Sequence, residues 1–328
     1  KNDKKINIVV ATSGDTGAAA IDAIKGKSNL NIFVLHPNNR ISPVQRKIMT
    51  TVEEKNVFNL AINGNFDDCQ NLVKSMFSDL EFSKSINMSG VNSINWARII
   101  AQTVYYFYSY FKLDKESISF SVPTGNFGDV FAGYLAKKMG LPIDKLIVAT
   151  NENDILHRAI SKGDYISKEV KETLSPSMDI QLASNFERLI YYVNNSDSEK
   201  TAEIMKKVKQ NSYQIEKNNL DIIQKDFLSE SCNEQETLDI IKKNYEENNI
   251  ILDPHTAVGV GAAKKLSFND CVVLSTAHPC KFPDAINSAI NKSEKLPQEL
   301  QHVLDKVEIF QVLKNNTEDV KKFVKSKL

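Results

Sequence analysis

The sequence predicts an α/β protein in two lobes, each built on a buried parallel sheet. Short runs rich in Val and Ile alternate with stretches whose apolar residues recur at helical spacing, which is typical of βαβ units. A chain of 328 residues is long enough to form two such lobes. Several predicted strands end in loops rich in Gly, Ser or Thr, and open α/β sheets bind their ligands at these strand ends.

The first, smaller lobe is expected to comprise residues 1–112. Its long last helix carries many aromatic side chains, which could stack on nucleotides, but their helical spacing favours packing in a core or an interface. A boundary at residues 112–117 is expected to separate the lobes. The predicted strands are 6–11, 32–35 and 57–62, and the predicted helices are 16–23, 44–52, 66–80 and 94–111.

The second, larger lobe is expected to comprise residues 113–328. Residues from about 186 to 248 are strongly charged and mostly helical in pattern, so they are interpreted as a helical insertion without a chemical motif. The predicted strands are 118–122, 146–149, 250–252 and 271–275, and the other predicted helices are 129–139 and 258–266.

Charge and hydropathy exclude several classes of protein. Lys and Arg together number 41, as do Asp and Glu, so the formal net charge is zero and no nucleic-acid or membrane partner is expected. No apolar run approaches the roughly 18 residues of a membrane helix. The cysteines lack CxxC spacing, which favours structural roles over a metal site and indicates a reduced compartment, the cytoplasm or an organelle matrix. They are Cys69, Cys232, Cys271 and Cys280.

Two glycine-containing loops follow predicted strands and open predicted helices. The first, residues 11–18, carries hydroxyls at Thr12, Ser13 and Thr16, and its helix N-terminus offers N–H groups to a carboxylate or phosphate. The second, residues 122–129, has two glycines that let the backbone approach a ligand closely, although it matches neither GxGxxG nor a P-loop. An ordinary capped turn is an equal alternative for the first loop and the favoured one for the second.

Two further positions are candidates for ligand binding. Thr276 follows the strand at 271–275, where its hydroxyl would meet either a ring nitrogen of a ligand or water, and His278 beside it fits a structural role better than that of a base. Arg98 lies on an otherwise apolar, aromatic helix, and a buried guanidinium needs an anionic partner. That partner is a bound phosphate or carboxylate, or else an internal Asp or Glu, which is the more ordinary case.

Eight strings of residues, taken together, resemble the long microbial and fungal type of threonine synthase. They occur in the family's order, and the longer ones are too specific to match by chance. The strings are ATSGDTG (11–17), HPNNRISPVQRKIMTT (36–51), GNFDDCQ (64–70), VNSINWARI (91–99), VPTGNFGD (122–129), SPSMDIQLASNFERL (175–189), DPHTAVG (253–259) and STAHPCKFPDA (275–285).

The resemblance implies a fold type II pyridoxal-phosphate enzyme, similar to the tryptophan synthase β-chain, which converts O-phospho-L-homoserine and water to L-threonine and phosphate. It implies that residues 125–129 cradle the phosphate of pyridoxal 5'-phosphate, that Thr276 faces the pyridine nitrogen, and that Asp15 lies near the ring oxygen. The cofactor-binding residues would be Gly125, Asn126, Phe127, Gly128, Asp129, Thr276 and Asp15. The substrate carboxylate would contact Thr12, Ser13 and Thr16, and the substrate phosphate would contact Ser93, Asn95 and Arg98.

One feature of the family has no counterpart in this chain. The Schiff-base lysine of the family lies in an early segment with a Phe-Lys-Asp motif, and no such motif occurs in residues 1–328. The sequence opens at Lys1 without Met and enters a predicted strand almost at once. We therefore expect a longer protein whose Schiff-base lysine lies upstream of Lys1, no catalytic residue within the present chain, and no activity of the chain alone.

Two alternatives remain open at this stage. One is another fold type II enzyme, such as a serine/threonine dehydratase, which would not need an arginine in the position of Arg98. The other is a non-catalytic, ligand-binding fragment. In either case the expected partner is a small molecule, and the chain is expected to be a monomer or a homodimer.

Overall fold

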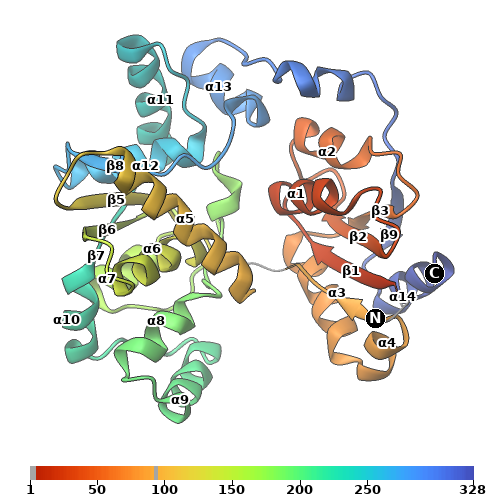
Figure 1. Cartoon of the computed structure of the whole chain (residues 1–328), viewed down its shortest axis with the longest axis horizontal. Helices are drawn as coiled ribbons and strands as arrows, with labels where there is room; N and C mark the ends of the chain where they lie inside the picture. Colours follow the sequence, from red (N-terminus) through yellow and green to blue (C-terminus); the bar gives the residue numbers. More distant parts are fainter. Residues whose placement is uncertain (1–4, 92–94) are drawn as a thin grey trace. The chain divides into compact units, whose positions relative to one another are not determined.

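The computed structural model describes residues 5–91 and 95–328, which form two units (Figure 1). The first unit comprises residues 1–92 and 295–328, and the second comprises residues 93–294. Each unit has its own parallel sheet and its own hydrophobic cores. The predicted α/β class is therefore confirmed.

The first unit contains one five-stranded parallel sheet of order β4-β1-β2-β3-β9. Its strands are β1 (Ile6–Ala11), β2 (Leu30–Pro37), β3 (Val57–Asn63), β4 (Met88–Ser89) and β9 (Gln311–Lys314). Its helices are α1 (Asp15–Ile24), α2 (Pro43–Thr50), α3 (Phe66–Ser78), α4 (Leu80–Ser85), the 3-10 helix η3 (Gln298–Val303) and α14 (Thr317–Ser326).

Helices cover both faces of this sheet. Along the central strand β2, Phe33 and Leu35 pack into the core formed with α3, α4 and α14, whereas Ile32 and Val34 pack into the core formed with α1 and α2. Successive side chains of a strand point to opposite faces, so a strand covered on both sides is apolar at consecutive positions, as residues 32–35 are. This is why β2 was recognisable in the sequence as a continuous apolar run.

The C-terminal residues return to the first unit, which differs from the expected division at residues 112–117. Strand β9 pairs with β3, and α14 contacts α3, as Figure 1 shows for the dark-blue end of the chain. Glu308 accepts hydrogen bonds from Arg46 Nε at 2.8 Å and Nη2 at 3.1 Å, and from Thr50 Oγ1 at 2.9 Å. Backbone pairing and this ion pair hold residues 295–328 to the first sheet, and neither leaves a pattern in the local sequence.

We expect Glu308→Gln to lower the thermal midpoint of unfolding at pH 7. The hydrogen bond from Arg46 holds the pKa of Glu308 below its ordinary value, although partial burial opposes it. A lowered pKa stabilises the folded state above the unfolded pKa of about 4.3, and this stabilisation is lost as the pH falls through the folded pKa. The difference from wild type should therefore be about 1 kcal/mol at pH 7, begin to shrink as the pH falls below about 4, and vanish once the pH is below the folded pKa. Glu318→Gln, which changes an exposed carboxylate of α14, is the control. If the stability difference between Glu308→Gln and wild type persists in acid, the ion pair with Arg46 is not its cause.

The second unit contains a four-stranded parallel sheet of order β7-β6-β5-β8. Its strands are β5 (Ile118–Pro123), β6 (Ile143–Thr150), β7 (Phe227–Ser231) and β8 (Cys271–Val273). Its helices are α5 (Trp96–Lys112), α6 (Gly128–Lys138), α7 (Ile155–Lys162), η1 (Pro176–Met178), α8 (Phe186–Val193), α9 (Ser198–Lys209), α10 (Lys217–Asp226), α11 (Glu234–Asn248), α12 (Pro254–Lys265), η2 (Pro279–Lys281) and α13 (Pro283–Ile290).

The charged segment 186–248 is mostly helical, as expected, but it also supplies β7, an edge strand paired with β6. Another sequence-based expectation for this unit was wrong. The strand expected at 250–252 does not form. Its neighbours Asn249 and Asp253 cap α11 and α12, and Ile251 packs in a small core with α11 and α13.

The aromatic helix α5 packs on α6 within the second unit, which differs from its expected place in the first. Tyr106 is fully buried and its hydroxyl donates to the carbonyl oxygen of Asp129 at 2.8 Å, as expected for core packing. Trp96, Tyr105 and Tyr108 are exposed. Within residues 5–91 and 95–328, every helix falls short of the length and apolar character needed to span a bilayer.

Candidate functional site

The loop between β5 and α6 presents main-chain donors at a helix N-terminus. Phe127, the N-cap residue of α6, has a left-handed backbone with φ of 63°, which is unusual for a bulky residue. Its fully buried ring packs against Phe186 and Phe227, and this packing holds the turn. No side chain of the described residues caps α6, so its first N–H groups are available to an anion.

Backbone lies close to this loop on two sides. A Cβ at Gly125 would lie 2.5 Å from the carbonyl oxygen of Ser177, in η1, so glycine alone fits there. The carbonyl oxygen of Asn126 accepts hydrogen bonds from Asn185, from its main-chain N at 3.1 Å and its side-chain Nδ2 at 3.2 Å. The loop therefore has a fixed shape before any ligand binds, as a phosphate cradle requires.

Asp129 lies in the first turn of α6. Burial raises the pKa of its carboxyl to about 6, although the hydrogen bond that Tyr106 donates to Oδ1 at 3.1 Å has the opposite effect. Both contacts of Tyr106 to Asp129 join α5 to α6. In the structure Asp129 thus serves helix packing, and its contact with a cofactor stays a prediction.

Thr276 lies at the same edge of the sheet as the Gly125 loop. Both follow neighbouring parallel strands, β8 and β5, at their carboxyl ends. The Thr276 side chain is exposed, and its Oγ1 lies 3.4 Å from Thr256 Oγ1 and 3.5 Å from Asp253 Oδ1. These distances are long for hydroxyl hydrogen bonds, so the hydroxyl can turn toward a ligand.

Arg98 on α5 has no acidic partner within the described part of the chain. Its Nη1 is buried and makes no hydrogen bond there, and burial lowers the pKa of the guanidinium. An internal carboxylate, the more ordinary alternative for its partner, is therefore missing from residues 5–91 and 95–328. A desolvated guanidinium without a partner is costly, which favours a bound anion.

Two other predicted phosphate ligands precede Arg98. Asn95 is exposed and caps α5 through Oδ1, which accepts a hydrogen bond from the N–H of Ala97 at 3.0 Å. Its amide N–H₂ group is the part left for a ligand. Ser93, the other predicted contact of the substrate phosphate, lies outside the described residues.

The predicted position of the Schiff-base lysine is not tested by the structure. That lysine is expected upstream of Lys1, and Lys1 itself lies outside the described residues, which begin at residue 5. The expectation that the catalytic lysine precedes this chain therefore stays a prediction.

The loop at residues 11–18 belongs to the first unit. Thr12 is buried, and its Oγ1 accepts hydrogen bonds from the N–H groups of Gly14 at 3.0 Å and Gly17 at 2.8 Å, so it shapes the loop. Ser13 and Thr16 are half-buried and carry the more accessible hydroxyls. Asp15 Oδ1 accepts a hydrogen bond from Gln45 Nε2 of α2 at 3.1 Å.

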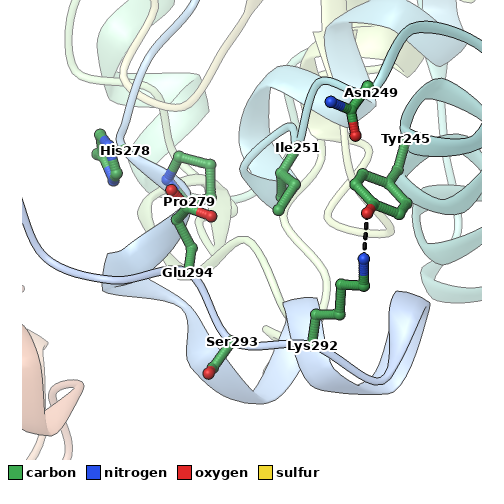
Figure 2. A pocket seen from close by; sticks show the side chains of 8 residues that line it. All are labelled: Tyr245, Asn249, Ile251, His278, Pro279, Lys292, Ser293 and Glu294. Carbon is green, nitrogen blue, oxygen red and sulfur yellow. Dashed lines mark hydrogen bonds between the residues drawn. The ribbon is translucent and has the colours of Figure 1, made fainter.

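A separate pocket of about 440 Å³ contains none of the predicted site residues (Figure 2). His278 lies at its edge, and its Nδ1 accepts a hydrogen bond from the N–H of Cys280 at 3.3 Å, which agrees with the expected structural role. Across the pocket Lys292 donates a hydrogen bond to the hydroxyl of Tyr245. The lining residues are Tyr245, Asn249, Ile251, His278, Pro279, Lys292, Ser293 and Glu294.

Two family models together match most of the chain. The model described as "Pyridoxal-phosphate dependent enzyme" matches residues 1–210, and the model described as "Threonine synthase, C-terminal" matches residues 256–324. The chain therefore belongs to the pyridoxal-phosphate-dependent enzyme family, and pyridoxal phosphate is its cofactor. Within that family it belongs to the threonine synthases, as its relatives show.

Three relatives illustrate this membership. The threonine synthase of Saccharomyces cerevisiae is 48% identical over 91% of this chain and 64% of its own length. That of Pseudomonas aeruginosa is 45% identical over 99% of this chain and 71% of its own. The crystal structure of PLP-bound threonine synthase from Brucella melitensis has a TM-score of 0.93 and 47% identity, covering 99% of this chain and 71% of that one. The chain thus spans about two thirds of the length of these relatives.

Proposed function

We propose that this chain is the larger part of a threonine synthase that converts O-phospho-L-homoserine and water to L-threonine and phosphate. The observation that carries the proposal is Arg98, a half-buried residue whose buried Nη1 makes no hydrogen bond among the described residues. A substrate phosphate satisfies that guanidinium through paired, charge-assisted hydrogen bonds. A dehydratase acting on free serine or threonine offers no such group, and relatives at 45–48% identity are threonine synthases.

The loop at residues 125–129 would bind the cofactor phosphate through the N–H groups that open α6. Thr276 would place a neutral hydroxyl at the pyridine nitrogen, and Asp15 would lie near the ring oxygen. Pyridoxal phosphate supplies an electron sink for the reacting carbons. Two observations support the fit between this loop and the cofactor phosphate. The N-terminus of α6 is uncapped, and there is no space for a side chain at Gly125.

The substrate would be held at both ends. Ser13 and Thr16 would receive its carboxylate, in a loop whose shape Thr12 maintains. Arg98 and Asn95, together with Ser93, would receive its phosphate. Each anionic group of the substrate would then have polar or charged partners.

The Schiff-base lysine is proposed to lie upstream of Lys1, since the family's Phe-Lys-Asp motif does not occur in these 328 residues.

The site of action is proposed to be the cytoplasm, and the four cysteines, all free thiols, agree with a reduced compartment. A monomer or a homodimer is proposed, which gel filtration would distinguish.

The test compares the complete protein, meaning this chain with any segment encoded before it, with residues 1–328 alone. The complete protein is expected to form threonine and phosphate in equal amounts from O-phosphohomoserine, and to form no 2-oxo acid from serine or threonine. Residues 1–328 alone are expected to form neither product. Production of 2-oxo acid without phosphate by the complete protein would refute the proposed function. Phosphate release by residues 1–328 that a carbonyl reagent abolishes would show that another lysine serves.

A further inference from the structure

A buried carboxylate, Asp253, joins three segments of the second unit. It is only 1% exposed and is the N-cap residue of α12, where Oδ1 accepts the N–H of His255 at 2.9 Å. The side chains of both His255 and Thr256 also contact it. Burial acts to raise the pKa of Asp253, but these hydrogen bonds outweigh it and hold the pKa below its ordinary value. Asp253 is therefore a stable anion with its acceptors in use.

The first contact runs from Asp253 through His255 to the wall of the phosphate loop. The N–H of Ser177 donates to His255 Nε2 at 3.2 Å, and a main-chain N–H can only donate, so Nε2 carries no proton. The ring proton therefore lies on Nδ1, which donates to Asp253 Oδ1 at 3.0 Å. The carbonyl of the same Ser177 faces Gly125. His255 thus fixes the backbone segment against which the Gly125 loop packs.

The second contact runs from Asp253 through Thr256 to Thr276. Thr256 Oγ1 donates to Asp253 Oδ2 and accepts the N–H of Thr276 at 3.1 Å. Thr256 gives its only hydroxyl proton to Asp253, so the Thr276 hydroxyl is the donor in its long contacts with Thr256 Oγ1 at 3.4 Å and Asp253 Oδ1 at 3.5 Å. Because contacts of this length are weak, a ligand can accept the hydrogen bond of Thr276 in their place. Asp253 thus sets the place of Thr276 through Thr256.

We propose that Asp253, His255 and Thr256 are positioning residues that hold the two cofactor-binding segments, the Gly125 loop and Thr276, in register with each other. The proposal rests on the cofactor site assigned above to residues 125–129 and Thr276. It does not depend on the substrate. A cofactor held at its phosphate and at its ring nitrogen needs both contacts at a fixed separation, and one buried anion linked to both segments, through His255 and Thr256, supplies it.

Two substitutions of His255 separate positioning from simple packing. In His255→Gln the side-chain oxygen can still accept the N–H of Ser177, whereas in His255→Asn the amide still donates to Asp253 but falls short of Ser177. Both remove the ring that packs on Phe282 at 4.9 Å, so both should lower the thermal midpoint to a similar extent. His255→Asn should raise the dissociation constant of pyridoxal phosphate about tenfold or more. His255→Gln should change it less than about threefold.

The measurement is titration of the apo form of the complete protein with pyridoxal phosphate, followed by visible absorption, beside thermal unfolding. His36→Asn, which removes a fully buried histidine from the first unit, is the control. It should lower stability without weakening the binding of pyridoxal phosphate. If the two His255 variants bind pyridoxal phosphate equally weakly, or if neither binds it more weakly than wild type, the proposal is overturned. Weakening in His255→Gln alone would also overturn it, because the contact with Asp253 would then suffice.

The contact of Thr256 with Asp253 and Thr276 is tested by the visible absorption spectrum of the bound cofactor. Thr256→Val removes the hydroxyl that Asp253 and Thr276 share, so the Thr276 hydroxyl should turn to Asp253 and the visible band of the bound cofactor should shift. Thr256→Ser keeps the hydroxyl and should keep the band. Unchanged bands in both variants would overturn this contact. Normal cofactor binding by the unaltered complete protein without threonine formation would instead count against the proposed function alone.

Discussion

Replacing Gly125 with alanine is expected to raise the dissociation constant of pyridoxal phosphate on the order of a hundredfold. This is the size of effect expected when a binding group is misplaced by about 1 Å. The added methyl would lie 2.5 Å from the carbonyl oxygen of Ser177, whereas ordinary contacts begin at 3.4 Å. Neither side can give way easily, because the N–H of Ser177 is bonded to His255 and the neighbouring Met178 is buried in a core. The loop itself must therefore move, and its N–H groups with it.

The measurement is again the dissociation constant of pyridoxal phosphate in the complete protein. Gly64→Ala is the matched control, because the nearest atoms to its methyl belong to the side chain of Asp68 at the surface-exposed start of α3 and not to backbone. The control should keep full cofactor affinity. If Gly125→Ala binds the cofactor within about twofold of wild type, the loop at residues 125–129 does not cradle its phosphate.

The elements that were predictable from the sequence are the central strands. β2 and β5 are buried on both faces, and apolar residues at 32–35 of β2 and apolar or small residues throughout β5 make each run recognisable without knowledge of its neighbours. β7 and β9 are edge strands of mixed composition, FLSES and QVLK. Their pairing with β6 and β3 defines them, and pairing over such separations leaves no local pattern.

The candidate site shows the same limit. The need of Arg98 for an anion followed from its own helix, where no acid stands one turn away. The role of His255 did not, because its partner Ser177 lies 78 positions away in the sequence. The Asp-Pro-His-Thr sequence could have indicated a helix N-cap at Asp253, but not the segments that this cap joins.

Replacing Arg98 in the complete protein is expected to lower kcat/KM for O-phosphohomoserine about thirty- to a hundredfold, the equivalent of about 2–3 kcal/mol. Arg98→Lys keeps a positive charge but loses the planar fork that pairs with two phosphate oxygens, so it should fall well below wild type. Arg98→Ala should fall at least as far. The cofactor should stay bound with an unchanged visible spectrum, because its phosphate is assigned to the N–H groups of the Gly125 loop.

Lys112→Ala, an exposed cation in the last turn of the same helix, is the control and should keep full catalytic efficiency. Stability must be measured alongside, since Arg98→Ala also relieves a buried guanidinium without a partner and should not destabilise the unliganded protein. A variant that lost its fold would lose cofactor and activity together. The expected pattern is the opposite one, a stable protein that binds its cofactor but no longer grips the phosphate of its substrate. If both variants keep full catalytic efficiency, or lose cofactor along with activity, the substrate phosphate binds elsewhere and Arg98 serves the structure of α5.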